Sequence, residues 1–245
     1  MEGAYAIGDV HGHLDLLVAA HARIALDRRR TGSEAPVVHL GDLVDRGPES
    51  AEVVEFLRMG PTGGPPWITL KGNHDLMFAL FLRDAGARDP GLRRDLSWLH
   101  GKLGGGATLR SYGVEVEGWP LPTVWAEATA RVPATHRAFL EGLPLMHRTR
   151  GATFVHAGIR PGVPLEAQTD TDLLWIREGF LDDPRDHGPL VVHGHTVVER
   201  PAHFGNRVDL DTGAAYGGPL TAAVVEGREV WVLGEDGREA LLPPG

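Results

Sequence analysis

Five short polar clusters carry residue types that could bind metal ions, and each directly follows a short apolar run. They are Gly-Asp-Val-His-Gly at residues 8–12, Gly-Asp-Leu-Val-Asp-Arg-Gly at 41–47, Lys-Gly-Asn-His-Asp at 71–75, His-Ala-Gly at 156–158 and His-Gly-His-Thr at 193–196. Carboxylates, an amide and imidazoles form a mixed set of nitrogen and oxygen donors, which suits first-row cations such as Mn, Fe or Zn. The clusters therefore predict a metal-dependent site.

Six side chains of these clusters are candidate metal ligands: Asp9, His11, Asp42, Asn73, His156 and His195. Asp9 and His11 are separated by one residue, so both can point at one ion, and the carboxylate of Asp42 could bridge two ions. Two cations about 3.5–4 Å apart would activate a bridging water as the nucleophile and neutralise a phosphoryl group during in-line displacement. The predicted chemistry is hydrolysis of phosphate esters or anhydrides.

Four further side chains could act on the substrate itself. His74 directly follows a candidate ligand, and we interpret it as the general acid that protonates the leaving oxygen, with Asp45 holding its ring in position. Arg46 and Arg177 could clamp the non-bridging phosphate oxygens through bidentate hydrogen bonds. These roles assume that all four side chains lie beside the metal ligands.

The apolar runs before the clusters predict buried strands that end sharply at glycine. They occur at residues 4–7, 36–40, 67–70, 152–155 and 190–192. Helical patterns lie between them, at residues 13–30, around 53–57, and at 76–83 and 172–181. Because ligands in such α/β folds gather at the carboxyl ends of the strands, we expect the five clusters to meet at one edge.

The C-terminal stretch predicts consecutive strands at residues 207–210, 220–225 and 229–233, the last two joined as a hairpin by Glu-Gly-Arg. These strands suggest a second, more antiparallel sheet packed on the first. We therefore predict an α/β (α+β) fold of two packed mixed β-sheets flanked by helices. Residues 1–245 would form one domain, with an insertion or cap at about 85–133, where no polar cluster of this kind occurs.

Composition excludes several other classes of protein. The 245 residues are 42% hydrophobic and 23% charged, and the net charge of -9 argues against a nucleic-acid or anionic-membrane surface. The absence of cysteine excludes disulfides, zinc-thiolate sites and cysteine nucleophiles. No apolar stretch approaches the ~20 residues of a membrane span, and no leader is recognisable, so we expect a cytoplasmic protein.

Two further motifs imitate known sites. Asp211-Thr212-Gly213 is similar to an aspartic-protease signature, but that chemistry needs two such carboxylates and the chain has no second copy. We interpret it as a turn after a strand. The glycine-rich stretch at residues 101–106 lacks the Gly-Lys-Ser/Thr ending of a phosphate-binding P-loop.

Three motifs in order carry a resemblance to a known family: Gly-Asp-x-His-Gly, Gly-Asp-x-Val-Asp-Arg-Gly and Gly-Asn-His-Asp. The chain resembles the calcineurin-like metallophosphoesterases, and the Asp-Arg-Gly ending resembles their phosphoprotein phosphatase branch. The resemblance implies a four-layer sandwich in which Asp9, His11 and Asp42 bind the first metal. It assigns Asp42, Asn73, His156 and His195 to the second metal. Asp75 departs from many eukaryotic relatives, which have Glu there.

Residues 175–177 (Trp-Ile-Arg) and 206–220 look like the bacterial members, which include small Ser/Thr protein phosphatases and hydrolases of diadenosine tetraphosphate. We expect a Ser/Thr phosphoprotein phosphatase with two divalent ions, Mn first and otherwise Fe or Zn. Its partner would be a phosphorylated protein or a small phosphate-containing substrate, with no nucleic acid and no membrane; the sequence does not indicate an oligomeric state.

Three different functions would also fit the sequence. A symmetrical bis(5'-nucleosyl)-tetraphosphatase would use the same site chemistry, and a basic or aromatic pocket for adenine would favour it. Candidates for such a pocket are Arg93, Arg94, Trp98 and Arg110, although Trp98 could equally be core. A metal-dependent nuclease would share the mechanism, but the acidic balance disfavours it. A non-catalytic metal-binding module is the third, and for such a protein we would expect ligands to be missing.

Overall fold

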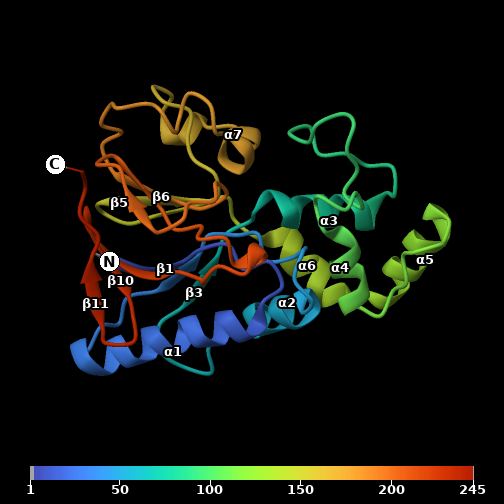
Figure 1. Cartoon of the computed structure of the whole chain (residues 1–245), viewed down its shortest axis with the longest axis horizontal. Helices are drawn as coiled ribbons and strands as arrows, with labels where there is room; N and C mark the ends of the chain where they lie inside the picture. The colour runs from blue at the N-terminus through green and yellow to red at the C-terminus, as the bar shows by residue number, and fades with distance from the viewer. Residues whose placement is uncertain (1–2, 245) are drawn as a thin grey trace.

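Two mixed β-sheets stack face to face in the computed structural model, which describes residues 3–244, and helices cover both outer faces (Figure 1). The strand order is β11-β10-β9-β1-β2-β3 in the first sheet and β4-β5-β6-β8-β7 in the second. This arrangement confirms the predicted α/β class with two packed mixed sheets.

The strands of the first sheet are β1 (Gly3–Ile7), β2 (Val37–His39), β3 (Trp67–Thr69), β9 (Ala222–Glu226), β10 (Glu229–Leu233) and β11 (Arg238–Ala240). Those of the second sheet are β4 (Met146–Arg148), β5 (Ala152–Val155), β6 (Leu190–His193), β7 (Ala202–His203) and β8 (Arg207–Asp209). Each sheet contains three adjacent parallel strands: β1, β2 and β3 at one edge of the first sheet, and β5, β6 and β8 in the middle of the second.

The α-helices are α1 (Leu14–Thr31), α2 (Ser50–Met59), α3 (Asn73–Arg83), α4 (Gly105–Ser111), α5 (Leu121–Arg131), α6 (Ala134–Gly142) and α7 (Asp170–Trp175). Two short 3-10 helices, η1 (Leu165–Ala167) and η2 (Ala214–Tyr216), lie in loops. Among residues 3–244, no helix combines the length and the hydrophobicity that crossing a membrane would require.

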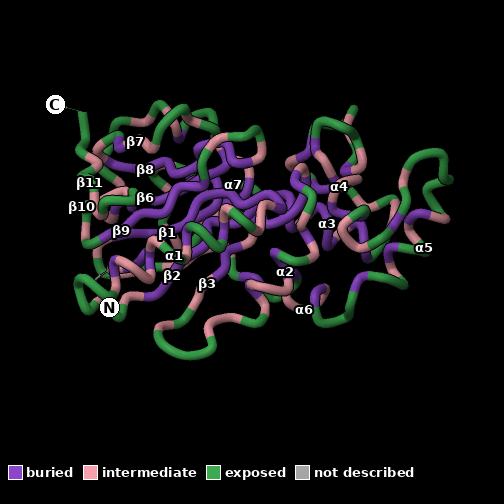
Figure 2. Tube along the Cα trace, turned by 60° about the horizontal axis from the view of Figure 1, so that its bottom comes forward, coloured by how far each residue is buried: buried purple, intermediate pink, exposed green. Residues whose placement is uncertain are grey.

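Successive side chains of β1 point to opposite faces of the first sheet, and this explains why the sheet is packed on both faces. Ala4 and Ala6 face the second sheet and pack with residues such as Phe154 of β5, whereas Tyr5 and Ile7 face α1 and pack with residues such as Leu17. Figure 2 shows the central strands buried almost throughout, and α5, at the far end of the molecule, largely exposed. The core therefore runs along both faces of the first sheet and holds the ends of its strands in place.

Two expectations from the sequence were wrong in detail. The C-terminal strands β9 and β10 do form a hairpin, but they join the first sheet beside β1 instead of forming the second. The second sheet is built around β5 and β6. The helix expected at residues 172–181 ends at Trp175, because Ile176 is extended and Gly179 adopts a positive φ of 78°. Ile176 and Phe180 are instead buried against β5 and β6.

A buried ion pair ties α1 to the end of the first sheet, and it predicts a stability effect. Asp27 accepts hydrogen bonds from the hydroxyl of Tyr5 (2.8 Å) and from Nε and Nη2 of Arg238 (both 2.9 Å). Burial opposes ionisation of Asp27, but the hydrogen bonds from Arg238 and Tyr5 outweigh it and lower its pKa. The charged form is therefore the one that the fold stabilises.

Replacing Asp27 with alanine is expected to lower the free energy of unfolding by about 3 kcal/mol, because the buried hydroxyl of Tyr5 and two nitrogens of Arg238 lose their acceptor. Arg238 keeps its ion pair with Glu226. Urea denaturation followed by circular dichroism measures this. Asp95→Ala is the matched control, since its ion pair with Arg93 lies on the surface, and it should change stability little. Equal effects of the two substitutions would contradict the prediction.

Candidate dinuclear metal site

The predicted clusters from both sheets converge on one cavity of about 230 Å³. The loops that follow β1, β2 and β6 and the first turn of α3 after β3 each contribute lining residues, as the strand pattern predicts. Eight predicted site residues line it: Asp9, His11, Asp42, Arg46, Asn73, His74, Arg177 and His195. His156 and Asp45 are fully buried and do not line the cavity, but His156 contacts Asn73 and Asp45 contacts His74. The structure thus brings all ten predicted residues together.

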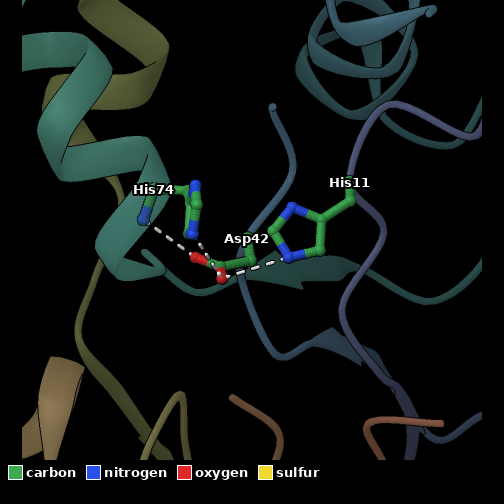
Figure 3. A group of neighbouring side chains, drawn as sticks. All are labelled: His11, Asp42 and His74. Carbon is green, nitrogen blue, oxygen red and sulfur yellow. Dashed lines mark hydrogen bonds and ion pairs between the residues drawn. The ribbon is translucent and has the colours of Figure 1, made fainter. Parts of the chain in front are cut away.

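Asp42 lies between the two groups of candidate ligands. Its Oδ2 is 3.4 Å from Nε2 of His11, and its Oδ1 is 3.4 Å from Nε2 of His156. Oδ1 also accepts a hydrogen bond from the backbone N–H of His74 (2.9 Å). Figure 3 shows the rings of His11 and His74 approaching this carboxylate from opposite sides. The carboxylate therefore faces both halves of the site, as a bridging ligand must.

Backbone carbonyls set the protonation of two imidazoles. Nδ1 of His11 lies 2.8 Å from the carbonyl oxygen of Val44, and Nδ1 of His156 lies 2.9 Å from that of Leu40. A carbonyl oxygen can only accept, so Nδ1 carries the proton in both rings, and Nε2 presents its lone pair to the other candidate ligands. Metal-binding histidines use the same arrangement, in which the nitrogen away from the ion donates a hydrogen bond to the protein.

Burial and crowding of the acids favour a bound cation. Burial raises the pKa of Asp9 well above its usual value, and the charges of Asp211 and Asp42 raise it further. Burial likewise lowers the pKa values of His11 and His195 well below the usual one, so both rings are neutral. Neutral imidazoles and close carboxylates are the forms that bind a divalent ion, and its charge would relieve the repulsion between the acids.

Two buried side-chain atoms of the candidate metal ligands have no hydrogen-bond partner, and a bound metal ion would supply the missing partner. Oδ1 of Asp9 and Nε2 of His195 are buried and have no hydrogen-bond partner. A Cβ atom at Gly194 would lie 2.0 Å from Oδ1 of Asp9, and one at Gly72 would lie 2.1 Å from Oδ1 of Asp42. Only glycine permits these approaches of backbone to carboxylate. The donor set, its orphaned atoms and its close packing all fit metal ions.

Backbone strain is concentrated at the same place. Within residues 3–244, the non-glycine residues with positive φ are His11 (45°), Asp42 (48°), Asp45 (74°), Arg46 (71°) and His195 (64°). All five are predicted site residues. Such conformations cost of order 1–3 kcal/mol each and persist where the surrounding structure enforces them for function. The loops are therefore held in the conformation that brings these five side chains to the site, four of them lining the cavity and Asp45 bonded to His74.

His74 and Asp45 form a closely bonded pair. Nδ1 of His74 lies 2.6 Å from Oδ2 of Asp45. Asp45 is held in turn by Thr108, whose hydroxyl donates to Oδ1 (2.6 Å), and by Trp98, whose Nε1–H donates to Oδ2 (2.8 Å). Because Asp45 accepts from Nδ1, the Nε2 atom of His74 faces the cavity. This is the predicted orientation for a group that exchanges a proton with substrate.

Arginines approach the cavity from two sides. Nη1 of Arg46 lies 2.5 Å from Nε2 of His11, and its Nη2 lies 3.1 Å from Nε2 of His74. Arg177 is exposed, lines the cavity and donates to the carbonyl oxygen of His195 (3.1 Å). Since a guanidinium is only a donor, both imidazoles accept from Arg46 in this structure. Arg46 therefore occupies space that a metal or phosphate would share.

Sequence reasoning missed several residues around the cavity. Asp211, interpreted only as a turn residue, does accept from the N–H of Gly213 (3.0 Å), and it also lines the cavity. Tyr216 and Trp175 line it as well. Thr108 showed no pattern that would connect it with Asp45. The position of Asp211 directly after a strand was the one usable signal, since the metal-site clusters stand at such positions.

The geometry defines a metal-dependent phosphoester hydrolase, and comparison with known proteins agrees. Residues 4–223 match the family described as calcineurin-like phosphoesterase. The chain belongs to this family, whose members use a dinuclear metal site.

Two full-length relatives differ in substrate. Serine/threonine-protein phosphatase 1 of Salmonella typhimurium is 30% identical over 235 residues, which cover 91% of each chain. The asymmetrical bis(5'-nucleosyl)-tetraphosphatase PrpE of Halalkalibacterium halodurans is 26% identical over 237 residues, or 88% of this chain and 87% of that one. The fold is also similar to a cold-active protein-tyrosine phosphatase of a Shewanella species (TM-score 0.64, 18% identity, 99% and 81% coverage).

Metal binding should be visible without any assay of activity. Adding Mn²⁺ at about 100 times its dissociation constant to the chelator-treated protein is expected to stabilise it by about 2.7 kcal/mol. For a chain of this size that corresponds to a rise in Tm of about 5–11 °C. Differential scanning calorimetry with and without Mn²⁺, Fe²⁺ or Zn²⁺ measures the shift and ranks the metals. An unchanged Tm with all three would contradict a metal site here.

Proposed function

We propose that the protein is a Ser/Thr phosphoprotein phosphatase that uses His74 as general acid. The observation that carries the proposal is the His74–Asp45 pair, with Nδ1 and Oδ2 2.6 Å apart, beside the candidate metal-bridging carboxylate Asp42. Similarity along the full chain to a bacterial serine/threonine-protein phosphatase supports the choice of substrate. By the same proposal, Asp9, His11 and Asp42 hold one metal ion, and Asp42, Asn73, His156 and His195 hold the other.

When bound, the two divalent ions supply the positive charge that polarises the phosphoryl group and activates water. The protein's own residues orient the ester and protonate the leaving oxygen. Nε2 of His74 accepts a hydrogen bond from Arg46 here, and Nδ1 holds the proton of the ring toward Asp45. Nε2 must therefore be released by Arg46 and take up a proton from water before it can act as the acid. Phosphate oxygens are stronger acceptors for a guanidinium than an imidazole is. Substrate binding therefore draws Arg46 toward the phosphate, and Arg177, which lines the same cavity, can bind a further phosphate oxygen. Nε2 of His74, once protonated from water, passes that proton to the leaving oxygen.

A dinucleoside tetraphosphate hydrolase is the second candidate. Its phosphoanhydride would meet the same residues, and the 26% identity to an asymmetrical bis(5'-nucleosyl)-tetraphosphatase favours it. The aromatic candidate for an adenine pocket does not support it, because Trp98 is buried in the core and donates its N–H to Asp45. We therefore place the phosphoprotein substrate first.

The deciding experiment assays the metal-stripped protein, with and without Mn²⁺, on three substrates in parallel. These are p-nitrophenyl phosphate, a phosphoserine or phosphothreonine peptide, and diadenosine tetraphosphate. Mn²⁺-dependent release of phosphate from the peptide, with little cleavage of the dinucleotide, supports the proposal. Preferential cleavage of the dinucleotide moves the protein to the second candidate. No hydrolysis of any substrate by the metal-loaded protein would bring forward a non-catalytic metal-binding role.

A further inference from the structure

A second cavity, of about 790 Å³, opens beside the metal site. It shares Arg46 and Tyr216 with the site cavity, so the two adjoin at these side chains. Lys102 and Arg110 line it from the segment that contains α4, and Gly104 and Gly106 contribute its glycine-lined wall. Tyr216 is 68% exposed at the junction, where its ring centre lies 5.2 Å from the guanidinium of Arg46. We call this second cavity the cationic groove.

The groove concentrates positive charge on an acidic protein. The chain carries a net charge of -9, and some arginines elsewhere on the surface pair with carboxylates, as Arg131 does with Glu127. Within residues 3–244, the side chains of Lys102 and Arg110 form neither an ion pair nor a hydrogen bond. The groove is lined by three cationic side chains and one carboxylate, Glu117. Lys102 and Arg110 are therefore free for a ligand to neutralise, whereas Arg46 is bonded to the two imidazoles of the metal site.

We propose that the cationic groove binds acidic residues that flank the phosphorylated residue of a protein substrate, an inference that rests on the proposed function. A peptide whose phosphate lies against Arg46 must leave the site cavity, and an extended chain advances about 3.3 Å per residue. Carboxylates a few residues from the phosphoserine then reach Lys102 and Arg110. The peptide backbone packs on the exposed face of Tyr216.

The test measures selectivity between two phosphoserine peptides, one with glutamates around the phosphoserine and one with alanines. The wild type should have the higher kcat/KM for the acidic peptide, and the Lys102→Glu, Arg110→Glu double variant should lower the acidic-to-neutral ratio by about tenfold or more, since two close charge contacts are reversed. Arg94→Glu and Arg93→Glu together form the matched control: these exposed arginines lie outside the groove lining. This control variant should keep the wild-type ratio of kcat/KM for the acidic peptide to kcat/KM for the neutral peptide.

Each contrary result overturns the proposal in a distinct way. A wild type without preference for the acidic peptide, or a double variant with an unchanged ratio, removes the groove as a peptide subsite. An unchanged peptide ratio combined with reduced cleavage of diadenosine tetraphosphate reassigns the groove to a polyphosphate. Failure of the wild type on both peptides, with p-nitrophenyl phosphate still cleaved, overturns the phosphoprotein function itself.

Trp98 lies between α3 and α4, and its Nε1–H donates to Oδ2 of Asp45 (2.8 Å), the same oxygen that is bonded to Nδ1 of His74 (2.6 Å). The indole is 6% exposed and stacks on Phe78 of α3, with ring centres 5.1 Å apart. Asp45 itself has a left-handed backbone conformation (φ 74°) and is fully buried. Trp98 therefore fixes the rotamer of the carboxylate that orients His74.

We infer that Trp98 is a positioning residue for proton transfer by His74. Without its N–H, the carboxylate of Asp45 loses one of the hydrogen bonds that hold Oδ2, and the imidazole loses its fixed direction. The loss matters only where the leaving group needs a proton. An alkoxide or phenolate of high pKa needs the acid more than p-nitrophenolate does.

Trp98→Phe keeps the ring stack and removes the N–H, so it is the variant to compare on phenyl phosphate and p-nitrophenyl phosphate. We expect kcat for phenyl phosphate to fall about tenfold with KM unchanged, the loss of one hydrogen bond to a charged group. The fall on p-nitrophenyl phosphate should be much smaller. Trp125→Phe is the control, since it removes the bond from Nε1 to the carbonyl of Phe81 (2.9 Å), outside the site. Equal falls on both substrates, or no fall on either, would show that Trp98 is only structural.

Discussion

Replacing His74 with alanine is expected to lower kcat by about 10²–10⁴ while two metal ions stay bound, because the variant loses proton transfer to the leaving oxygen. His74 is not among the predicted ligands, yet the structure places its Nε2 4.0 Å from Oδ2 of Asp42 and groups it with His11 and Asp42 in a possible metal-binding set. Activity alone therefore does not separate an acid from a ligand.

The measurement that separates the two roles is metal content. Single-turnover kinetics on phenyl phosphate should be combined with the number of ions per chain, determined by elemental analysis. Wild-type occupancy with slow turnover supports the acid role, whereas loss of one ion would make His74 a ligand. His136→Ala is a suitable control: this histidine is buried but bonds to Glu55 and Tyr112, away from the cavity. Full activity of the His74 variant would remove it from the mechanism.

Most of the site could be predicted from the sequence because its candidate metal ligands lie directly after the ends of strands. Each ligand cluster directly follows an apolar run in the sequence, and parallel strands place their carboxyl ends at the same edge of the sheet. Asp9 after β1, Asp42 after β2 and Asn73 after β3 could be expected to meet for this reason alone. The short spacing between ligand and strand leaves the chain few other conformations.

The pairing of strands that lie far apart in the sequence could not be predicted in the same way. The pairing of β1 with β9 joins Gly3 to Glu226 across most of the chain, and no local pattern specifies it. For this reason β9 and β10 were expected in the wrong sheet. Periodicity identifies a strand and its buried face, but the neighbour of that strand depends on the packing of the whole sheet.

The environment of Asp45 was hidden for a similar reason. Its partners Trp98 and Thr108 lie 53 and 63 residues further along the chain, in the segment between α3 and α5. An indole and a threonine hydroxyl are common residues without a signature of their own, and Trp98 could equally be a core residue. It is in fact both, since its ring packs in the core while its N–H reaches the acid pair. Only the folded arrangement reveals the second role.

Asp42→Ala is expected to abolish metal binding at both positions, because it is the one residue assigned to both ions. Its carboxylate oxygens face His11 on one side and His156 on the other, each at 3.4 Å. Substituting only a residue that hydrogen-bonds to a metal ligand weakens metal binding by about 10–100-fold, so losing a bridging ligand should cost at least the upper end of that range. Isothermal titration with Mn²⁺ and the rise in Tm on adding Mn²⁺ both measure the loss.

Asp211→Asn is the matched control for this substitution. Asp211 is also a buried carboxylate that lines the cavity and contributes to the raised pKa of Asp9, but it is not assigned as a ligand. If the site needs negative charge in general, both variants should lose Mn²⁺ to a similar extent. If Asp42 bridges, only Asp42→Ala should fail to bind two ions, and Asp211→Asn should keep both. Two ions at full occupancy in Asp42→Ala would remove it as the bridge and require another residue to join the two halves of the site.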